Sequence, residues 1–345
     1  MNKEKVKSQY PLVSQYPLVS ICTPTFNRRP FIPIMLKCFL NQDYPKNRME
    51  WIIIDDGTDK IEDLVANNPN FPQIQYYKYE EKLSLGKKRN LAHEKCKGDI
   101  IVYMDDDDYY PPQRVSHAVQ ILQNNPLALC AGSSCMHIFF KHIGRMYKFG
   151  PYGPNHATAA TFAFRKELLL QTGFDNKACL AEEKHFLKNY TIPFVQLDTM
   201  KTILVFSHVH NSFDKKTLIK DGENPYLKMV DTPVQEFVKE PDIFRFFMND
   251  IDELLNNYHP GTPDNKPDVL KQIDEIQSER EKKMVEHQHW SNSPFTQEMQ
   301  NKMNQMNVYI QELTMENNIL KDKNGYLEGK ITKLIQDLIE LKKAK

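Results

Sequence analysis

Short apolar runs alternate with amphipathic stretches along the first third of the chain. The apolar runs are continuous and end in polar or acidic residues, as is typical of strands buried on both faces. Strands are expected at residues 18–25, 51–57, 74–79 and 99–104. Helices are expected between and before them, at 31–42, 60–68 and 86–96. This order predicts an α/β fold with a mostly parallel, doubly wound sheet and flanking helices.

The same kind of pattern continues to about residue 260. Further elements are expected as helices at 159–170, 180–189 and 233–258 and as a strand at 202–206. Prolines and a glycine at 260–267 then interrupt the pattern, as expected at a domain boundary. The hexapeptide SQYPLV occurs twice in tandem at 8–19, and only its second copy continues into an apolar run. We therefore expect a disordered N-terminal segment (1–16), a globular domain (17–260), a linker with a helix (261–295) and a coiled coil (296–345).

A heptad pattern supports the coiled coil. Met or Leu recurs at every seventh position, at Met299, Met306, Leu313, Leu320, Leu327, Leu334 and Leu341. Met, Ile, Asn or Leu lies four residues after each of the first six, and opposite charges such as Glu316 and Lys321 flank the pattern. This arrangement predicts a parallel two-stranded coiled coil, and hence a homodimer joined through residues 296–345. The alternative, one amphipathic helix packed on the globular domain, predicts a broader apolar stripe without charge pairing.

The charge balance and the cysteines exclude several classes of protein. The 345 residues include 45 Lys and Arg and 45 Asp and Glu, so a net charge of zero argues against a nucleic-acid or membrane-surface binder. No apolar run approaches the roughly 18 residues of a membrane span. The N-terminus lacks the apolar region of a secretion signal. The six cysteines form no CxxC pair and no zinc spacing, so we expect reduced thiols in a cytoplasmic protein rather than a disulfide framework.

Four consecutive aspartates at 105–108 directly follow the apolar run 99–104. Adjacent carboxylates at the end of a buried strand repel each other, by on the order of a few kcal/mol per pair. A divalent cation removes this repulsion, and Mg²⁺ or Mn²⁺ completes its coordination with substrate phosphate oxygens. The run therefore predicts a Mn²⁺ or Mg²⁺ site for a phosphorylated substrate, at the sheet edge where parallel strands end. The alternative is a solvated acidic loop.

Several segments carry a family resemblance in their order and spacing. They are VSICTPTFNR at 19–28, IIIDDGTD at 52–59, LGKKRN at 85–90, IVYMDDDDYYPP at 101–112, FAFRKELLLQTGFD at 162–175 and AEEKHFL at 181–187. Together they resemble the family 2 glycosyltransferases of GT-A fold, over roughly residues 17–215. The resemblance implies a Rossmann-like GT-A domain that inverts the anomeric centre of a nucleotide-sugar donor.

The resemblance also implies where the donor nucleotide binds. The family's nucleoside positions match Thr23, Pro24, Thr25, Asp55 and Asp56, where an acidic side chain accepts the imide N–H of uracil or thymine. Asp105 and Asp106 match positions near the ribose and diphosphate. The G-x-x-R-N segment at residues 86–90 resembles the family's glycine–arginine–asparagine element, where backbone amides and Arg89 at a helix start suit a diphosphate. Lys87 and Lys88 fit this role or a solvated basic face equally well.

The metal ligands are likewise taken from matched positions. The family's DxD motif falls on Asp105 and Asp107, with Asp107 as the direct ligand and Asp105 nearer the ribose or diphosphate. Asp108 is expected to hold the loop. His208 and His210 resemble a position from which a histidine approaches the metal or the diphosphate, although a structural role is the alternative.

The catalytic base is expected in a pair of glutamates. An inverting enzyme needs a carboxylate that takes the proton of the acceptor hydroxyl. The family's Glu-Asp pair corresponds to Glu182 and Glu183, so Glu183 is the expected base and Glu182 the second choice. Glu in place of Asp moves the carboxylate about one methylene further out. The alternative is a pair of solvated glutamates on a helix.

The function expected from these features is the transfer of a single sugar from a UDP-sugar. The Gln-x-x-Arg-Trp element of polymerising family members is absent from the sequence. The acceptor stays open among glycans, proteins and small molecules. Two other functions remain: a scaffold that binds nucleotide sugars and is oligomerised by the coiled coil, and a sugar nucleotidylyltransferase, although TPTFNRRP at 23–30 lacks the glycines of that class.

Overall fold

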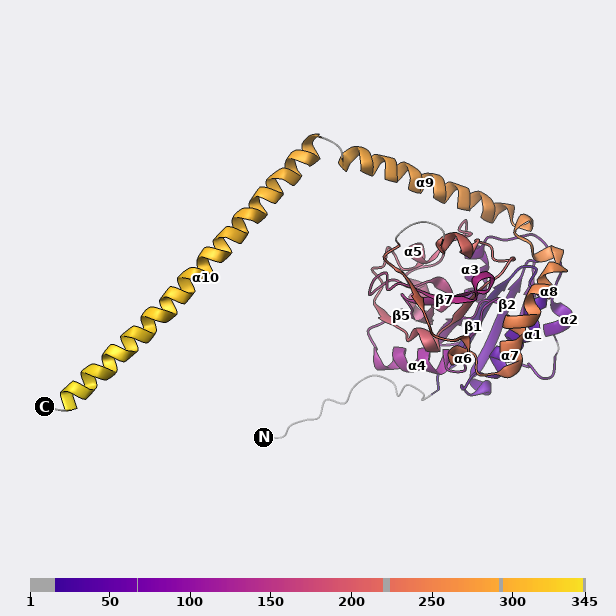
Figure 1. Ribbon diagram of the computed structural model, residues 1–345. Helices are drawn as coiled ribbons and strands as arrows, with labels where there is room; N and C mark the ends of the chain where they lie inside the picture. Colours follow the sequence, from indigo (N-terminus) through magenta and orange to yellow (C-terminus); the bar gives the residue numbers. More distant parts are fainter. Residues whose placement is uncertain (1–15, 67, 220–223, 292–293, 344–345) are drawn as a thin grey trace, which may run out of the picture. The chain divides into compact units, whose positions relative to one another are not determined.

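The structure is a computed structural model that describes residues 16–66, 68–219, 224–291 and 294–343. The expected N-terminal segment 1–16 therefore lies almost wholly outside the described residues. The chain divides into two compact units, Met1–Asp274 and Glu275–Lys345. The first unit holds both sheets, and the second consists of helix (Figure 1).

A seven-stranded sheet forms the centre of the first unit. Its strands, in spatial order, are β3 (Ile74–Lys78), β2 (Met49–Asp55), β1 (Val19–Thr25), β4 (Ile100–Tyr103), β8 (Ala163–Arg165), β5 (Cys130–Gly132) and β9 (Phe194–Gln196). All of them run in one direction except β8, which is antiparallel to both β4 and β5. The carboxyl ends of β1, β2, β4, β5 and β9 therefore meet at one edge, where ligands of such sheets bind.

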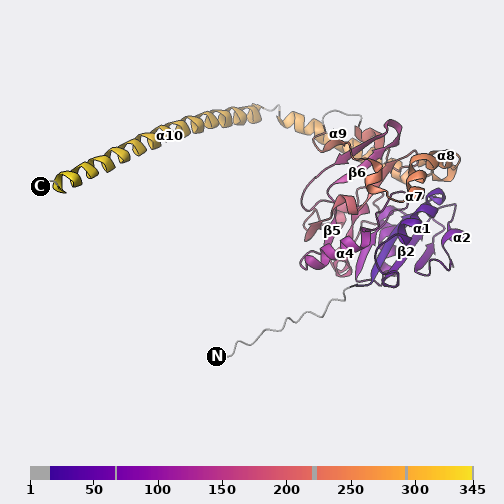
Figure 2. The ribbon, with the colours of Figure 1, turned by 60° about the horizontal axis from the view of Figure 1, so that its bottom comes forward.

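Helices cover both faces of this sheet, which explains the continuous apolar runs. In β2, Trp51 and Ile53 belong to one core and Ile52 and Ile54 to the other. Trp51 stacks on Phe39 of α1, with ring centroids 4.6 Å apart. The first face is covered by α1 (Ile32–Leu40), α2 (Glu62–Val65) and α4 (Arg114–Asn124), and the second by α3 (Leu85–Lys95) and α5 (Glu183–Phe186). Figures 1 and 2 show these helices around the sheet.

A second, four-stranded sheet lies beside the first, and of its strands only the one expected at 202–206 was predicted. Its order is β10 (Leu204–Ser207), β6 (Met136–Phe140), β7 (Arg145–Phe149) and β11 (Leu227–Val230). The helices α6 (Val234–Phe237), α7 (Pro241–Arg245) and α8 (Ile251–Asn256), with a π-helical turn at Phe246–Asp250, pack against its apolar side. Phe206 of β10 stacks on Phe247 at 4.2 Å.

Two expected helices were wrong. Residues 159–170 contain the strand β8 between short 3₁₀ turns, because a short apolar run does not distinguish a buried strand from a helix. The expected helix at 180–189 shrinks to α5, Glu183–Phe186. Lys188, Asn189 and Tyr190 adopt positive φ angles of 47°, 55° and 64°, which an α-helix cannot contain.

The C-terminal part of the chain is helical. It consists of α9 (Pro267–Ser291) and the 50-residue α10 (Pro294–Lys343). The compact first unit extends to Asp274 and so includes the start of α9. None of the helices that the structure describes combines the length and the apolar character needed to cross a membrane.

Candidate active site

The acidic run begins two residues after the end of β4, at the edge where β1 and β2 also end. Arg28, which follows β1, lies against two of its carboxylates. The Nη2 of Arg28 donates to the Oδ2 of Asp107 at 3.1 Å, and its Nε is 3.6 Å from the Oδ1 of Asp106. The Nε2 of His208 is 3.3 Å from the same Oδ2 of Asp107. Arg28 and His208, which are 79 and 101 residues away from Asp107 in the sequence, thus both contact its carboxylate.

Burial and mutual repulsion separate the four aspartates in their protonation. Burial alone raises the pKa of Asp107, but Arg28 and His208 hold it well below its ordinary range. Burial and the charge of Asp107 raise the pKa of Asp106 to about 7, and the same two causes raise that of Asp108 well above its usual value. Burial also raises the pKa of Asp105, against the opposing charge of Arg89. Ionisation of Asp105, Asp106 and Asp108 is therefore disfavoured, and a cation placed here would favour it.

The fit of this edge to a divalent ion can be judged from its donor atoms. Asp107 and His208 lie side by side, and burial lowers the pKa of His208 to about 4, so its ring is neutral at pH 7. The buried oxygens Thr25 Oγ1 and Asp108 Oδ1 lack a hydrogen-bond partner among the described residues. Asp105 turns instead to Arg89, at 3.4 Å. No group of three or more His, Cys, Asp or Glu side chains within the described ranges is arranged to hold a metal. Two ligands plus substrate phosphate oxygens fit the coordination habits of Mg²⁺ and Mn²⁺.

His210 does not join this pair. Its backbone N–H donates to the Nδ1 of His208 at 3.2 Å, and its own Nδ1 is buried without a hydrogen-bond partner in the part of the chain that the structure describes. Burial, helped by the charge of Arg28, lowers the pKa of His210 to about 4. The structure therefore brings together Asp107 and His208 of the four expected ligands.

Several residues that are expected to bind the nucleoside already use their polar atoms in hydrogen bonds within the protein. The hydroxyl of Thr23 donates to the Met104 carbonyl at 2.6 Å and accepts from Trp51 at 2.9 Å, so it is used inside the sheet. Asp55 accepts hydrogen bonds from the N–H groups of Gly57 and Ile61 and from the hydroxyl of Tyr76. These bonds shape the loop after β2.

Asp56 is also engaged within the protein. One of its oxygens pairs with the Nζ of Lys88 at 2.8 Å, and the other accepts from the Leu83 N–H at 2.6 Å. Among the expected donor residues, those that line the pocket at this edge are Pro24, Asp105 and Asp106, with Asp107 beside them.

The hydrogen bonds of the G-x-x-R-N segment 86–90 differ from those of the diphosphate-binding site that its sequence suggested. The first amides of α3 are used within the protein: Gly86 N–H donates to Ala178, and Lys87 N–H donates to the Ser84 cap. A β-carbon at Gly86 would lie 2.0 Å from the Asp175 carbonyl oxygen. The Asn90 side chain bonds the backbone of Phe174 in both directions, at 2.8 and 3.0 Å. Gly86 and Asn90 therefore lock the loop that leads to the glutamate pair.

Arg89 connects the acidic run to that pair. Its Nε donates to the Oε1 of Glu182 at 3.0 Å, and its Nη1 reaches the Oδ1 of Asp105 at 3.4 Å. The guanidinium stacks over the Tyr103 ring at 4.3 Å. Glu182 is thereby fixed as the buried partner of Arg89. Burial, reinforced by the charge of Glu182, raises the pKa of the neighbouring Glu183 to about 7. A carboxyl with this pKa is suited to take a proton near neutral pH.

A pocket of about 150 Å³ adjoins the acidic run and is lined by more cations than the sequence predicted. The ammonium groups of Lys82, Lys88 and Lys266 lie 5.1, 5.7 and 6.0 Å from the centroid of the Phe26 ring. Lys266 is only 5% exposed, and its Nζ bonds the Ser212 hydroxyl at 2.8 Å. Burial, followed by repulsion from Arg28, lowers the pKa of Lys266 to about 6.

The first turns of α9 close one side of this pocket. Asp268 forms an ion pair with Lys82. The backbone N–H groups of Cys179 and Leu180 donate to the Gln272 side chain at 2.7 and 2.8 Å. Sequence reasoning missed Lys266 and these contacts because they lie in a proline-rich segment that reads as a linker.

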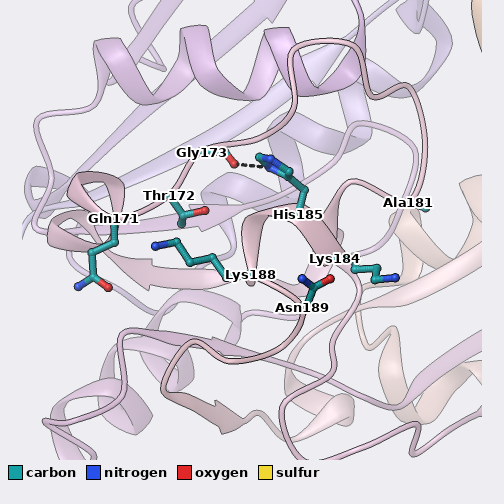
Figure 3. Close-up of a pocket in the computed structure, with 8 residues that line it drawn as sticks. All are labelled: Gln171, Thr172, Gly173, Ala181, Lys184, His185, Lys188 and Asn189. Atoms are coloured by element: carbon teal, nitrogen blue, oxygen red, sulfur yellow. Dashed lines mark hydrogen bonds between the residues drawn. The ribbon is translucent and has the colours of Figure 1, made fainter.

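A larger pocket of about 690 Å³ lies on the outer side of α5 (Figure 3). It contains none of the expected site residues, although Lys184 and Lys188 line it. Figure 3 shows these two side chains extending in opposite directions, so they do not converge on one ligand. His185 is tied to the Gly173 carbonyl at 3.0 Å. The polar groups that converge are those of the smaller pocket, and we place the candidate site there.

Comparison with known proteins gives one matching family. Residues 20–167 match the family described as Glycosyl transferase family 2. A putative colanic acid biosynthesis glycosyl transferase, WcaA of Escherichia coli strain K12, is 35% identical over 102 residues, which cover 29% of this chain and 36% of the relative. A putative teichuronic acid biosynthesis glycosyltransferase, TuaG of Bacillus subtilis strain 168, is 28% identical over 114 residues, covering 32% and 44%.

These matches span less than half the length of either relative. Among solved structures, residues 1–349 of Staphylococcus aureus TarS align with a TM-score of 0.45 and 21% identity. This alignment covers 55% of this chain and 60% of that one. The expected motifs at 20–112 all lie inside the matched family segment, whereas the glutamate pair, both histidines and Lys266 lie beyond it.

Proposed function

Residues 20–167 belong to glycosyl transferase family 2, and from this premise we propose that the chain transfers a single sugar from a nucleoside-diphosphate sugar to an acceptor hydroxyl. The observation that carries the proposal is the meeting of Arg28 and His208 at the Asp107 carboxylate, beside a pocket that Arg28 and the acidic run line. Arg89 connects Asp105 of this run to Glu182, the sequence neighbour of Glu183. Donor binding and proton removal are thus supported at the same sheet edge.

The donor diphosphate is proposed to lie among Arg28, Lys88 and Lys266. Lys266 is the basic side chain of the pocket that has no carboxylate within salt-bridge distance, as far as the described residues go. Burial lowers its pKa to about 6, so its amine is mostly neutral at pH 7, and an anionic diphosphate beside it would favour the charged ammonium form. The nucleoside is proposed to be uridine, held near Pro24 and the loop that Asp55 and Asp56 shape.

A divalent ion, Mn²⁺ or Mg²⁺, would be held by Asp107 and His208. When bound, it would supply positive charge against the departing diphosphate. Asp105 is proposed to face the ribose or diphosphate while paired with Arg89. Arg28 already neutralises Asp107 at this point, so it is expected to shift toward the diphosphate as the donor binds.

The proposed reaction is a single inverting displacement. The acceptor hydroxyl oxygen forms a bond to the anomeric carbon, and the bond from that carbon to the diphosphate oxygen breaks. The Glu183 carboxylate takes the hydroxyl proton, and the nucleoside diphosphate leaves with the bonding electrons. Arg89 donates a hydrogen bond to Glu182, and the charge of Glu182 adds to burial in raising the pKa of Glu183.

The remaining proposals concern assembly and location. The heptad side chains of α10 are exposed in the single chain, for example Leu320 at 52% and Leu327 at 53%. We propose that they are covered by a second copy in a parallel coiled coil, which makes the protein a homodimer. The six cysteines are free thiols, which is consistent with the proposed cytoplasmic location.

Titration calorimetry with UDP, in the presence and absence of Mn²⁺, tests the donor site. The wild type should bind UDP more tightly with Mn²⁺, and Asp107→Asn should remove most of the dependence on the metal. Glu236→Gln, at an exposed carboxylate on α6, is the control and should bind as the wild type does. Equal UDP binding with and without Mn²⁺ would overturn the metal site, and no UDP binding at all would overturn the donor proposal.

A further inference from the structure

Four rings of the first unit, those of Tyr226, Tyr152, His156 and Tyr190, form a connected row. The centroids of Tyr226 and Tyr152 are 4.9 Å apart, those of Tyr152 and His156 are 4.9 Å apart, and those of His156 and Tyr190 are 5.3 Å apart. We call these residues the aromatic platform. Tyr152 and Tyr226 are 41% and 45% exposed, which is unusual for rings that already pack on one another. Exposed, clustered aromatic rings mark binding surfaces.

The aromatic platform is held rigidly by its backbone. The Ser134 hydroxyl oxygen accepts from the N–H groups of Tyr152 and Gly153 at 2.8 and 3.0 Å. The Gln196 amide donates to the carbonyls of Pro154 and His156 at 2.8 and 2.9 Å. On the other side, Gly150 N–H donates to the Tyr226 carbonyl at 2.9 Å. The exposed rings are therefore presented in a fixed arrangement, which lowers the entropy lost when a ligand binds.

The anchors of the aromatic platform locate it at the active edge. Ser134 follows β5 by two residues, and Gln196 is the last residue of β9. Both strands run in the direction of β4, so their carboxyl ends lie at the same edge as the acidic run. In the strand order, β5 is two positions from β4 and β9 is three. At about 4.8 Å per strand, the anchors are roughly 10–14 Å along the sheet from the acidic run.

Tyr190 is the member of the aromatic platform that lies nearest the candidate base in the sequence, seven residues after Glu183 and four after the end of α5. Burial raises the pKa of Tyr190, and the charge of Glu183 raises it further. Asn155 donates its side-chain N–H to the Tyr190 carbonyl at 3.2 Å. Tyr190 also ends the run of three left-handed residues after α5. Such backbone strain persists where the surrounding structure imposes it, and it clusters at ligand sites.

The chemistry of the row favours a carbohydrate over a charged or peptide ligand. Burial lowers the pKa of His156, so its ring is neutral at pH 7 and the four side chains of the row carry no charge. Flat apolar faces with polar groups at their rims match a sugar ring, which presents C–H groups on its face and hydroxyls around its edge. The row extends over several rings, so it suits a chain of sugars rather than one.

We propose that the aromatic platform binds a carbohydrate chain of the acceptor, with the terminal sugar at Glu183 and the preceding sugars stacked along Tyr190, His156, Tyr152 and Tyr226. This inference rests on the proposed function for its direction, since Glu183 marks the reacting end. It names the acceptor as a glycan among the three classes that the sequence left open.

The test is binding of the full chain, with UDP present, to a printed array of oligosaccharides of graded length and an array of unglycosylated peptides. The wild type should bind a set of oligosaccharides, with longer chains bound more tightly. Tyr152→Ala and Tyr226→Ala should each weaken that binding about three- to ten-fold, and Tyr152→Phe should keep it. Tyr326→Ala, at a tyrosine on α10 that is 64% exposed, is the control and should change nothing.

UDP binding by the same variants separates this inference from the proposed function. Variants that lose oligosaccharide binding while UDP binding is unchanged support the aromatic platform. If the wild type binds UDP but no oligosaccharide, or if Tyr152→Ala and Tyr226→Ala bind oligosaccharides as well as the wild type does, the inference is wrong and the donor proposal stands. Binding to peptides alone would assign the surface to a protein acceptor and would also overturn the inference. Loss of UDP binding in the wild type would overturn the donor proposal instead.

Discussion

Burial and direct pairing together set the pKa values of single residues at the candidate site. Glu182 and Glu183 are sequence neighbours, yet Glu182 pairs with Arg89 whereas Glu183 has a pKa near 7. The acidic run divides in the same way, because the pKa of Asp107 is held low while those of Asp106 and Asp108 are raised. Two like groups with separated pKa values are the usual mark of distinct roles in one site.

The pKa of Glu183 gives a pH dependence. A general base must be deprotonated, so the turnover rate should fall about ten-fold per pH unit below pH 7 and level off above it. Replacing Glu183 by Gln should lower the turnover rate by about 10²–10⁴-fold and leave UDP binding intact. Nucleoside diphosphate release, measured across the pH range, checks both. Glu236→Gln, an exposed glutamate on α6, is the control. Unchanged turnover in Glu183→Gln would show that the base lies elsewhere.

We predict that Lys266 lowers the stability of the fold and strengthens donor binding. Its amine is neutral in the folded state at pH 7 and charged in the unfolded state, since its pKa falls from 10.5 to about 6 on burial. Folding must therefore release a proton between these two pH values, which opposes folding there, and this penalty fades as the pH approaches 10.5.

Lys266→Met should accordingly raise the free energy of unfolding at pH 7, by up to about 4 kcal/mol, while weakening UDP binding at least about ten-fold. Urea denaturation and calorimetry measure the two effects. Uridine, which lacks the diphosphate, should bind the wild type and the variant equally. A variant that is less stable and binds UDP normally would show that Lys266 has only a structural role.

At the scale of elements, the contact between α3 and the loop at 173–178 positions the glutamate pair. Gly86→Ala should destabilise the first unit by about 1–3 kcal/mol, because its β-carbon would clash with the Asp175 carbonyl although alanine is the better helix former. Gly329→Ala on α10 is the matched control, because nothing lies within 4 Å of the added carbon. It should stabilise that helix by about 0.5–1 kcal/mol. Thermal unfolding followed by circular dichroism measures both. Stabilisation by Gly86→Ala would contradict the close contact.

The elements that the sequence predicted well are those set by local pattern. The strands β1, β2 and β4 are buried on both faces, and their apolar runs end at the residues that begin the site. The strand β8 was taken for a helix because its three residues are too few to show a period. The second sheet was missed because MHIFF and RMYKF in β6 and β7 are aromatic segments joined by a short turn, and only their pairing in space distinguishes them from loops.

The residues of the candidate site also divide into those that the local sequence pattern predicts and those that it does not. The acidic run and the glutamate pair stand out in the sequence as clusters of like charge. The partners that tune them do not, since Arg28 contacts Asp107 from 79 residues away and Arg89 contacts Glu182 from 93 residues away. Lys266 is even further from Phe26 in the sequence, although its side chain approaches the Phe26 ring together with Lys82 and Lys88. Such pairs depend on tertiary packing, which local periodicity does not encode.

For the molecule as a whole, the start of α9 is predicted to belong to the donor site and α10 to the dimer. A chain ending at residue 291 should be a monomer that binds UDP as the full chain does. A chain ending at residue 260 should lose UDP binding, because it lacks Lys266 and the contacts of Asp268 and Gln272. Light scattering gives the mass, and calorimetry gives the affinity. Equal masses for the full chain and the 291-residue chain would contradict the coiled-coil dimer.

Donor turnover is the direct measurement of sugar transfer at the acidic run. The full chain is incubated with UDP-, dTDP- and GDP-sugars and Mn²⁺, with and without the oligosaccharides that it binds, and release of nucleoside diphosphate is measured. We expect release from at least one UDP-sugar, faster with acceptor, and little release by Asp107→Asn or Glu183→Gln. Release from no donor under any of these conditions, despite UDP binding, would show that the protein binds nucleotide sugars without transferring them.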